Sequence, residues 1–340
     1  MKKNIAIIFG CDSFEHTVSL ISGYNVGKTL HETNMYHIIF IGIMKNGTWK
    51  YSDTLDDILL NTESINTIHI NEDCADIYQI GKGEINNTPI YRAFLATHGQ
   101  FGEDGFLQGF LRMNQIKYTG NDVEGSAVCF NKTLCKYVAE LHSIKVVPYI
   151  CFNKYDLISI TSKDVQKLGE NYVVKVNKGG SSIGVYYADN TTIHNVINEA
   201  FKLDEVILIE TSLQDFRELS IGLLRCGEEL VCSDIGEVIK KNTRFTFEDK
   251  YITNDDYKQI VLPHLPASIK ERIRVDAMTL YNKLNLKSYV RVDFFVTTTN
   301  DVYFNEINNL PWLSPSSILI KLWESKYTYV ELLQHILTTL

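Results

Sequence analysis

Apolar positions in the first third of the chain fall into short continuous runs separated by a segment with helical spacing. The runs at 4–10 (NIAIIFG), 36–44 (YHIIFIGIM) and 90–99 (IYRAFLATHG) are typical of buried strands, and 17–33 (TVSLISGYNVGKTLHET) has the spacing of an amphipathic helix. Strands that alternate with helices indicate an open α/β module, which we expect to extend to about residue 120.

The remaining two thirds mix helical spacing with β-prone runs. Amphipathic helices are predicted at 126–144, 195–204, 271–285 and 329–340, and strands at 146–152, 205–213 and, as a β-rich meander, 218–239. The segment 172–188 (YVVKVNKGGSSIGVYYA) predicts a strand, a Gly-rich loop and a second strand. We divide the chain into an N-terminal module (1–120), a central module (121–210) and a C-terminal module (211–340).

Polar residues interrupt two β-prone runs near the end of the chain, RVDFFV and VYFNEIN. The polar residues 298–301 between them favour an antiparallel hairpin with a four-residue loop. This register places Asp293 opposite Glu306 and Arg291 opposite Asn308. Because side chains alternate along a strand, all four are expected on one face.

Two carboxylates that face each other across a hairpin repel and destabilise it, unless a cation lies between them. Carboxylate and amide oxygens without His or Cys favour Mg²⁺ or Mn²⁺. The sequence therefore predicts a metal site formed by Asp293, Glu306 and Asn308. The alternative is an ordinary solvated face, against which Phe295 and Phe304 argue, since we expect both on the same side.

A loop rich in Gly and Ser, KVNKGGSSIG (175–184), is the second candidate for chemistry. Such a loop can turn successive backbone N–H groups toward an anion, and Lys175 can direct an ammonium group at a phosphate. The loop is neither a Walker motif nor a dinucleotide fingerprint. Alone it could be a plain hairpin turn, but the carboxylates downstream favour a phosphate site.

Composition narrows the class of protein. The formal net charge of −8 argues against a general binder of nucleic acid or anionic membranes. Seven scattered cysteines without a CxxC pair indicate free thiols in a reducing cytoplasm. The apolar run after the first residues suits a strand better than a signal peptide. No apolar run in the sequence approaches the roughly 20 residues that span a bilayer.

Several motifs, taken in order, resemble the D-alanine–D-alanine ligase family of the ATP-grasp superfamily. They are GCDSFEHTVSLIS (10–22), HGQFGEDGFLQGFL (98–111), KVNKGGSSIGV (175–185), DKY (249–251), RVDFF (291–295) and NEINNLP (305–311). The resemblance implies a Rossmann-like N-terminal domain and two α+β domains that sandwich ATP. It also implies that ATP phosphorylates one D-amino acid, whose acyl phosphate is attacked by the amine of a second.

The resemblance further implies Mg²⁺ or Mn²⁺, with two ions, a cytoplasmic homodimer, and a role in peptidoglycan precursor synthesis. In the donor site Glu15 would hold the substrate ammonium, with Ser181 and Tyr251 keeping it in place. His98 would lie beside the donor carboxylate, and Glu103 and Asp104 would order the loop. The plainer alternatives are that Glu15 only caps the helix after the first strand and that His98 is a surface residue.

The family's remaining functional positions fall on polar residues here. The resemblance assigns the phosphates of ATP to Lys132, Lys175 and Lys250 with Ser181 and Ser182, adenine to Glu210, ribose to Glu218, the acyl-phosphate oxyanion to Arg291, the metal to Asp293, Glu306 and Asn308, and the carboxylate of the second substrate to Ser317. The spacing between Glu210 and Glu218 is one residue longer than the family's pattern.

The chain departs from the family around the acceptor site, reading NNLPW where NTLPG is usual. Trp312 either lines the pocket and changes the acceptor, or packs into the core. Asn131 replaces an Asp, Val176 replaces a Pro, and a Pro expected soon after Ser317 is absent. Tyr251, where ligases that use a hydroxy acid usually carry His, favours an amine nucleophile.

Three hypotheses follow from these observations. The first is a D-alanine–D-alanine ligase, and the second is a ligase that joins D-alanine to another amino acid. The third is a weakly catalytic ATP-binding protein with a regulatory role. The intact set of lysines and metal ligands argues against the third.

Overall fold

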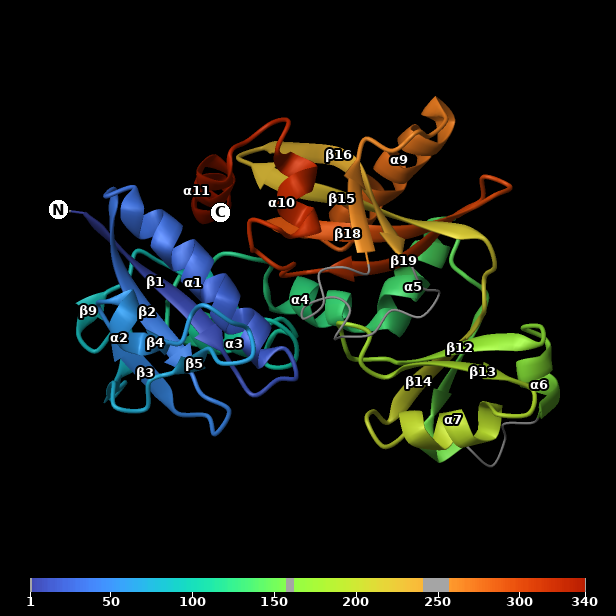
Figure 1. Ribbon diagram of the computed structural model, residues 1–340, viewed down its shortest axis with the longest axis horizontal. Coiled ribbons are helices and arrows are strands. Elements are labelled where there is room, and N and C mark those ends of the chain that lie inside the picture. The colour runs from blue at the N-terminus through green and yellow to red at the C-terminus, as the bar shows by residue number, and fades with distance from the viewer. Residues whose placement is uncertain (1, 157–161, 241–256, 340) are drawn as a thin grey trace.

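The computed structural model describes residues 2–156, 162–240 and 257–339, which build three large β-sheets with flanking helices (Figure 1), besides a two-stranded sheet (β4-β5) and a three-stranded one (β7-β8-β9). The three large sheets follow one another along the chain, as the predicted modules do. The predicted boundaries at 120 and 210 stay a prediction. The helices between 123 and 141, which that division gives to the central module, pack against the third sheet rather than the second.

The first sheet has the strand order β10-β1-β2-β3-β6. Strand β1 (Lys3–Gly10) is parallel to both of its neighbours, β10 (Arg92–Leu95) and β2 (Tyr36–Ile43), and α1 (His16–Glu32) packs against β1 and β2. The predicted strands and helix of this module are confirmed. Smaller elements complete it: β3 (Trp49–Ser52), α2 (Leu55–Ile58), β4 (Leu59–Leu60), β5 (His69–Ile70), β6 (Ala75–Asp76), β7 (Ile80–Gly81), β8 (Glu84–Ile85), β9 (Thr88–Pro89) and α3 (Phe106–Met113).

The second sheet is antiparallel, in the order β11-β14-β12-β13. Its elements are β11 (Tyr149–Asn153), a short 3-10 helix (Lys154–Asp156), α6 (Ser162–Gln166), β12 (Asn171–Val176), β13 (Val185–Asp189), α7 (Ile193–Ala200) and β14 (Val206–Thr211). Tyr172, Ile207 and Ile209 are fully buried beneath α7 and form the centre of its core. The Gly-rich loop joins β12 to β13, as predicted.

The third sheet is also antiparallel, in the order β17-β16-β15-β18-β19. Its elements are α4 (Val123–Phe130), α5 (Lys132–Leu141), β15 (Phe216–Cys226), β16 (Glu229–Lys240), β17 (Tyr257–Val261), α9 (Ala267–Lys283), β18 (Tyr289–Thr297) and β19 (Val302–Asn308). Helices α4, α5 and α9 all pack against β19, so the hairpin that carries the predicted metal ligands is supported from behind.

The prediction of a single helix over 126–144 is wrong, because the helix is interrupted at Asn131, which separates α4 from α5. Asn131 has an extended backbone, and its side chain accepts a hydrogen bond from the N–H of Leu134 (3.0 Å). It therefore caps α5, as Asn commonly does at a helix start. The break places Lys132 on the first turn, where its N–H bonds to Asn177 O (3.1 Å) beside the Gly-rich loop.

The predicted pairs of Asp293 with Glu306 and of Arg291 with Asn308 are confirmed, but the register that a four-residue loop implies beside the turn is wrong, because Val296 pairs with Val302. A bulge follows, so that Phe294 pairs with Phe304 and one residue of β19 is left over. The predicted position of Phe304 on the metal face is therefore wrong. Its ring is fully buried and packs edge-on against Phe294 (6.1 Å between centroids).

Two helices end the chain, α10 (Ile318–Trp323) and α11 (Tyr329–Thr338). Their apolar side chains join the core of the first sheet, and α11 packs against α1. The guanidinium of Arg92 on β10 donates to Leu337 O (2.9 Å), which fixes this return. No helix in the described part of the chain has the length and apolar character needed to cross a membrane.

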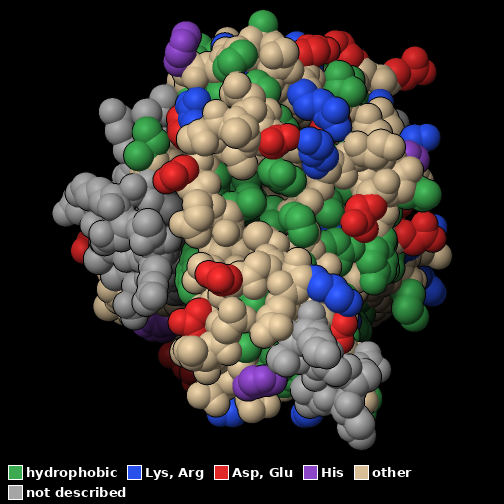
Figure 2. All heavy atoms as spheres, turned by 90° about the vertical axis from the view of Figure 1, so that its right-hand side faces the viewer, with side chains coloured by type: hydrophobic (Ala, Val, Ile, Leu, Met, Phe, Trp, Pro, Cys, Tyr) green, Lys and Arg blue, Asp and Glu red, His purple; other side chains and the backbone are tan. Residues whose placement is uncertain are grey.

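Charged side chains of both signs are interspersed over the face shown in Figure 2.

Candidate active site

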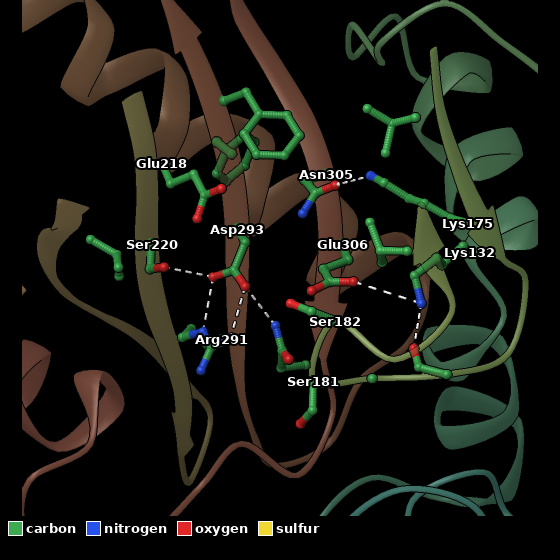
Figure 3. Close-up of a pocket in the computed structure, with 18 of the residues that line it drawn as sticks. Lys132, Lys175, Ser181, Ser182, Glu218, Ser220, Arg291, Asp293, Asn305 and Glu306 are labelled. Atoms are coloured by element: carbon green, nitrogen blue, oxygen red, sulfur yellow. Dashed lines mark hydrogen bonds and ion pairs between the residues drawn. The ribbon is translucent and has the colours of Figure 1, made fainter. Parts of the chain in front are cut away.

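A pocket lies where the three sheets approach one another, and Figure 3 shows part of it. The predicted site residues that the structure describes all line it: Glu15, His98, Lys132, Lys175, Ser181, Ser182, Glu210, Glu218, Arg291, Asp293, Glu306, Asn308, Trp312 and Ser317. They come from segments far apart in the sequence, so their convergence is a result of the fold. Lys250 and Tyr251 lie outside the described residues.

The carboxylate of Asp293 is the centre of one polar cluster (Figure 3). Arg291 donates to both of its oxygens, from Nε and Nη2, at 2.9 Å each. Asn308 Nδ2 donates at 2.7 Å and Ser220 Oγ at 2.6 Å. Ser220, which sequence reasoning missed, lies opposite Asp293 in the pairing of β15 with β18.

Glu306 faces the same space, and its nearest cation is Lys132, whose Nζ lies 3.8 Å from Oε2. Across the described residues there is no cluster of three or more His, Cys, Asp or Glu side chains arranged to hold a metal. The candidate ligands are instead two opposed carboxylates and the amide of Asn308. Hard oxygen donors of this kind fit Mg²⁺ or Mn²⁺, which commonly complete their coordination with phosphate and water.

A buried ion network lies on the other side of the pocket. Lys175 Nζ is 2.7 Å from Glu210 Oε2 and donates to Asn305 Oδ1 (3.1 Å). The second oxygen of Glu210, Oε1, is 2.9 Å from Lys136 Nζ. Burial alone would raise the pKa of Glu210, but Lys136 and Lys175 outweigh it and hold that pKa at about 2.

Asn305 and Lys136 were not predicted as part of the site. Asn305 reaches it because of the bulge in β19, which an ideal two-residue alternation does not contain. Lys136 lies four residues after Lys132 on α5, and this spacing places both on one side of the helix. The i,i+4 spacing of the two lysines was the available signal.

The loop between β12 and β13 covers the pocket with left-handed backbone at Ser181 (φ 52°), Ser182 (φ 64°) and Gly184 (φ 71°). The hydroxyl of Ser181 donates to Glu15 Oε1, and Lys132 Nζ donates to Gly179 O. The loop is thereby linked both to the N-terminal module and to the start of α5.

Glu15 precedes α1 but makes no side-chain capping bond, so the interpretation of Glu15 as a simple helix cap is wrong. Its side chain is buried in the pocket. It lies directly against Gly99, where any larger residue would clash, because a Cβ there would come within 2.8 Å of Glu15 Oε2. Glu103 accepts from Gly99 N (2.9 Å) and Asp104 from Phe101 N (2.9 Å), which confirms that both order the loop. Burial, and then the charge of Glu15, raises the pKa of Glu103.

His98 is only 4% exposed, so its interpretation as a surface residue is wrong. Nδ1 donates to the carbonyl of Leu310 (3.0 Å), and Nε2 meets the hydroxyl of Ser22 (2.7 Å). Burial lowers the pKa of His98 from 6.5 to about 4. The ring is therefore neutral at physiological pH, carrying its proton on Nδ1.

This neutral histidine predicts a pH dependence of stability. Because the folded pKa (about 4) lies below the unfolded value of 6.5, the contribution is complete above pH 6.5 and is lost as the pH falls toward 4. Between pH 7 and pH 5 the free energy of unfolding should fall by about 2 kcal/mol more in the native protein than in His98→Asn. Urea unfolding at both pH values measures this, and equal losses in the two proteins would contradict it.

Trp312 and Ser317, which the sequence assigns to the acceptor site, line the pocket together with Ile318. Trp312 is half-buried and lines the pocket, while it belongs to none of the buried core clusters. Ser317 is buried and caps α10, its hydroxyl accepting from the N–H of Ile320 (3.4 Å). Of the two alternatives for Trp312, the structure shows the one in which the ring lines the pocket.

The pocket also has an apolar wall, which suits a flat aromatic base. It is lined by Val147, Val173, Leu213, Phe216 and Phe295, and the rings of Phe216 and Phe295 meet edge to face at 4.8 Å. Glu218 lies on β15 opposite Phe295 of β18.

Two solved structures share this architecture over nearly their whole length. D-alanyl-alanine synthetase A from Vibrio cholerae has a TM-score of 0.83 and 27% identity, covering 99% of this chain and 98% of that one. The VanG D-Ala:D-Ser ligase from Enterococcus faecalis has a TM-score of 0.81 and 26% identity, with the same coverage. The fold and the site define an ATP-dependent ligase of the ATP-grasp class.

Sequence comparison gives the family. The descriptions "D-ala D-ala ligase N-terminus" and "D-ala D-ala ligase C-terminus" match residues 4–121 and 138–338. The D-alanine–D-alanine ligase of Clostridium novyi (strain NT) is 32% identical, covering 99% of this chain and 97% of its own. D-alanine–D-alanine ligase A of Escherichia coli (strain K12) is 30% identical, covering 95% and 91%. The chain belongs to the D-alanine–D-alanine ligase family.

Proposed function

We propose that the protein joins D-alanine to a second D-amino acid, with D-alanine as the leading candidate for the acceptor. The observation that supports this proposal is that one pocket brings together Glu15, the lysines Lys132 and Lys175, and the Asp293–Glu306 pair. An ammonium site, a polyphosphate site and a metal site are what this reaction requires in one place. Its product would enter peptidoglycan precursor synthesis.

In this proposal Glu15 holds the donor ammonium and His98, neutral, lies beside the donor carboxylate. A carboxylate oxygen attacks the γ-phosphorus of ATP, the bond to the bridging oxygen breaks, and ADP leaves. The acceptor amine then attacks the acyl carbon, loses a proton, and the tetrahedral intermediate expels phosphate. Positioning and charge stabilisation are the main catalytic terms in such transfers.

Lys132 and Lys175, with Lys250, would contact the phosphates of ATP, and Ser181 and Ser182 would cover them. Asp293, Glu306 and Asn308 would hold Mg²⁺ or Mn²⁺, as two ions, which neutralise phosphate charge. Glu210 would serve the adenine and Glu218 the ribose, and both line the pocket.

Arg291 would stabilise the oxyanion of the acyl phosphate. In the described structure it donates two hydrogen bonds to Asp293, so its guanidinium already points at the carboxylate that is proposed to hold the metal. Tyr251 would hold Glu15 in place together with Ser181. A homodimer is part of the same proposal, to be checked by sedimentation equilibrium.

The second candidate is a ligase that uses a different acceptor. Trp312 in the pocket favours it, because an indole where the family has Gly changes the shape of the acceptor end. One related structure is described as a D-Ala:D-Ser ligase, so the fold accommodates more than one acceptor.

Phosphate release with ATP and Mg²⁺ separates the candidates. The protein is given D-alanine alone and D-alanine paired with each of a panel of D- and L-amino acids, and the product mass is read. D-alanyl-D-alanine from D-alanine alone supports the first candidate. Mixed dipeptides without it support the second, and no ATP-dependent product from any pair contradicts both.

Trp312→Gly is expected to move acceptor preference toward D-alanine by about tenfold in kcat/KM relative to larger acceptors. The reason is that removal of the indole returns the close backbone approach that glycine permits. Competition between D-alanine and a second acceptor measures the ratio. Trp323→Phe, in the core away from the pocket, is the matched control. An unchanged acceptor profile in Trp312→Gly would show that the ring does not select the acceptor.

A further inference from the structure

Lys136 is a buried cation to which the proposed reaction gives no role. It is 1% exposed, lies on α5, and does not line the pocket, whereas Lys132 one turn earlier does. Its Nζ lies 2.9 Å from Glu210 Oε1 and 5.0 Å from the centre of the Tyr149 ring. A lysine is rarely buried to this degree unless its charge is paired.

Glu210 is bound on both oxygens, by Lys136 from behind and by Lys175 from the pocket side. The three side chains together carry one net positive charge. With Lys175 alone, the carboxylate and the ammonium would cancel in a buried environment. An approaching phosphate would then have to separate a buried pair, which leaves an uncompensated carboxylate and is strongly unfavourable.

Lys136 removes this difficulty because Glu210 stays neutralised when Lys175 turns to a phosphate. The carboxylate remains ionised, since the two lysines hold its pKa at about 2. The ammonium of Lys175 also donates to Asn305 Oδ1 (3.1 Å), which keeps it at the pocket wall. The arrangement leaves the charge of Lys175 available while its position is fixed.

We propose that Lys136 is a positioning residue, which compensates Glu210 so that the ammonium of Lys175 is available to the phosphates of ATP. The inference rests on the proposed function, in which Lys175 contacts those phosphates. Lys136 itself touches neither nucleotide nor substrate. Its effect should therefore follow the number of phosphates on the ligand.

The experiment compares the affinities of ATP, ADP and adenosine for the native protein and for Lys136→Met by calorimetry. Lys136→Met should bind ATP more weakly by about tenfold or more, ADP by less, and adenosine equally well. Equal ATP affinity would overturn the inference, as would an equal loss for ATP and adenosine, which would place the effect on the base or on the fold. Lys202→Met, which removes an exposed lysine paired to Glu199, is the matched control.

Two further variants keep the result interpretable. Lys136→Gln can still donate to Glu210 but has no charge, so it should lose ATP affinity as Lys136→Met does, and it carries the test if the Met variant does not fold. Native ATP affinity in Lys136→Gln would overturn the charge argument. Lys175→Met tests the proposed function separately: if it binds ATP normally, the phosphate role of Lys175 fails, whatever Lys136 does.

Discussion

Glu306→Ala is expected to lower ATP turnover by roughly a thousandfold, because it removes one of the two carboxylates proposed to hold the metal. The fold should persist, since Glu306 is partly exposed and its nearest cation, Lys132, is 3.8 Å away. Removal of one of two opposed carboxylates should leave the metal-free protein at least as stable. Turnover is measured by phosphate release, and stability by thermal unfolding with and without Mg²⁺.

The matched control is Asp301→Ala on the same hairpin. Asp301 is partly exposed and paired with Lys145 at 2.7 Å, away from the pocket lining. It should keep native turnover to within a few-fold and keep any stabilisation by Mg²⁺. If Glu306→Ala retained turnover within the same limits, the metal assignment would be wrong.

Glu15→Gln should raise the KM for the donor D-alanine by roughly a hundredfold, because it takes the counter-charge of a buried substrate ammonium away. Gln keeps the size of the side chain and can still meet the Ser181 hydroxyl. The affinity for ATP should change little, since Glu15 is proposed to bind the amino acid and not the nucleotide. Initial rates over a range of D-alanine at saturating ATP measure the change.

Asp12→Asn gives the same change of charge three residues earlier, at an exposed position. It should leave both substrates unaffected. A Glu15→Gln protein with native KM for D-alanine would return Glu15 to a role in packing, and a parallel loss of ATP affinity would indicate a displaced covering loop instead.

The long elements of the fold were predictable because each carries its own period. Strands β1, β2 and β14 are uninterrupted apolar runs, and α9 has unbroken helical spacing. The break at Asn131 was not, because helical spacing continues through it and only the cap geometry shows it. The spacing of apolar residues shows which face of a helix is buried. It does not change when the helix axis changes direction, so it cannot reveal the break.

The candidate site was predicted where residues share a strand or a loop. Asp293 and Glu306 were correctly placed opposite one another, but the pairing beside the turn is one residue out of the register that a four-residue loop implies, and the bulge restores it. The bulge that buries Phe304 and brings Asn305 to Lys175 has no signature in a regular alternation. The ion pair of Lys136 was missed because its partner Glu210 is remote in sequence. Only the tertiary structure brings α5, which carries Lys136, to β14, which carries Glu210.

Because α10 and α11 complete the core of the first sheet, the module that leaves the ribosome first cannot close its apolar interior by itself. Leu332, Leu333 and Ile336 are synthesised well after β1 and α1, although they belong to the same core. The usual order, in which an N-terminal domain folds during synthesis, is therefore restricted here. The part of the first core that α10 and α11 cover therefore stays exposed on the nascent chain until these two helices have been synthesised.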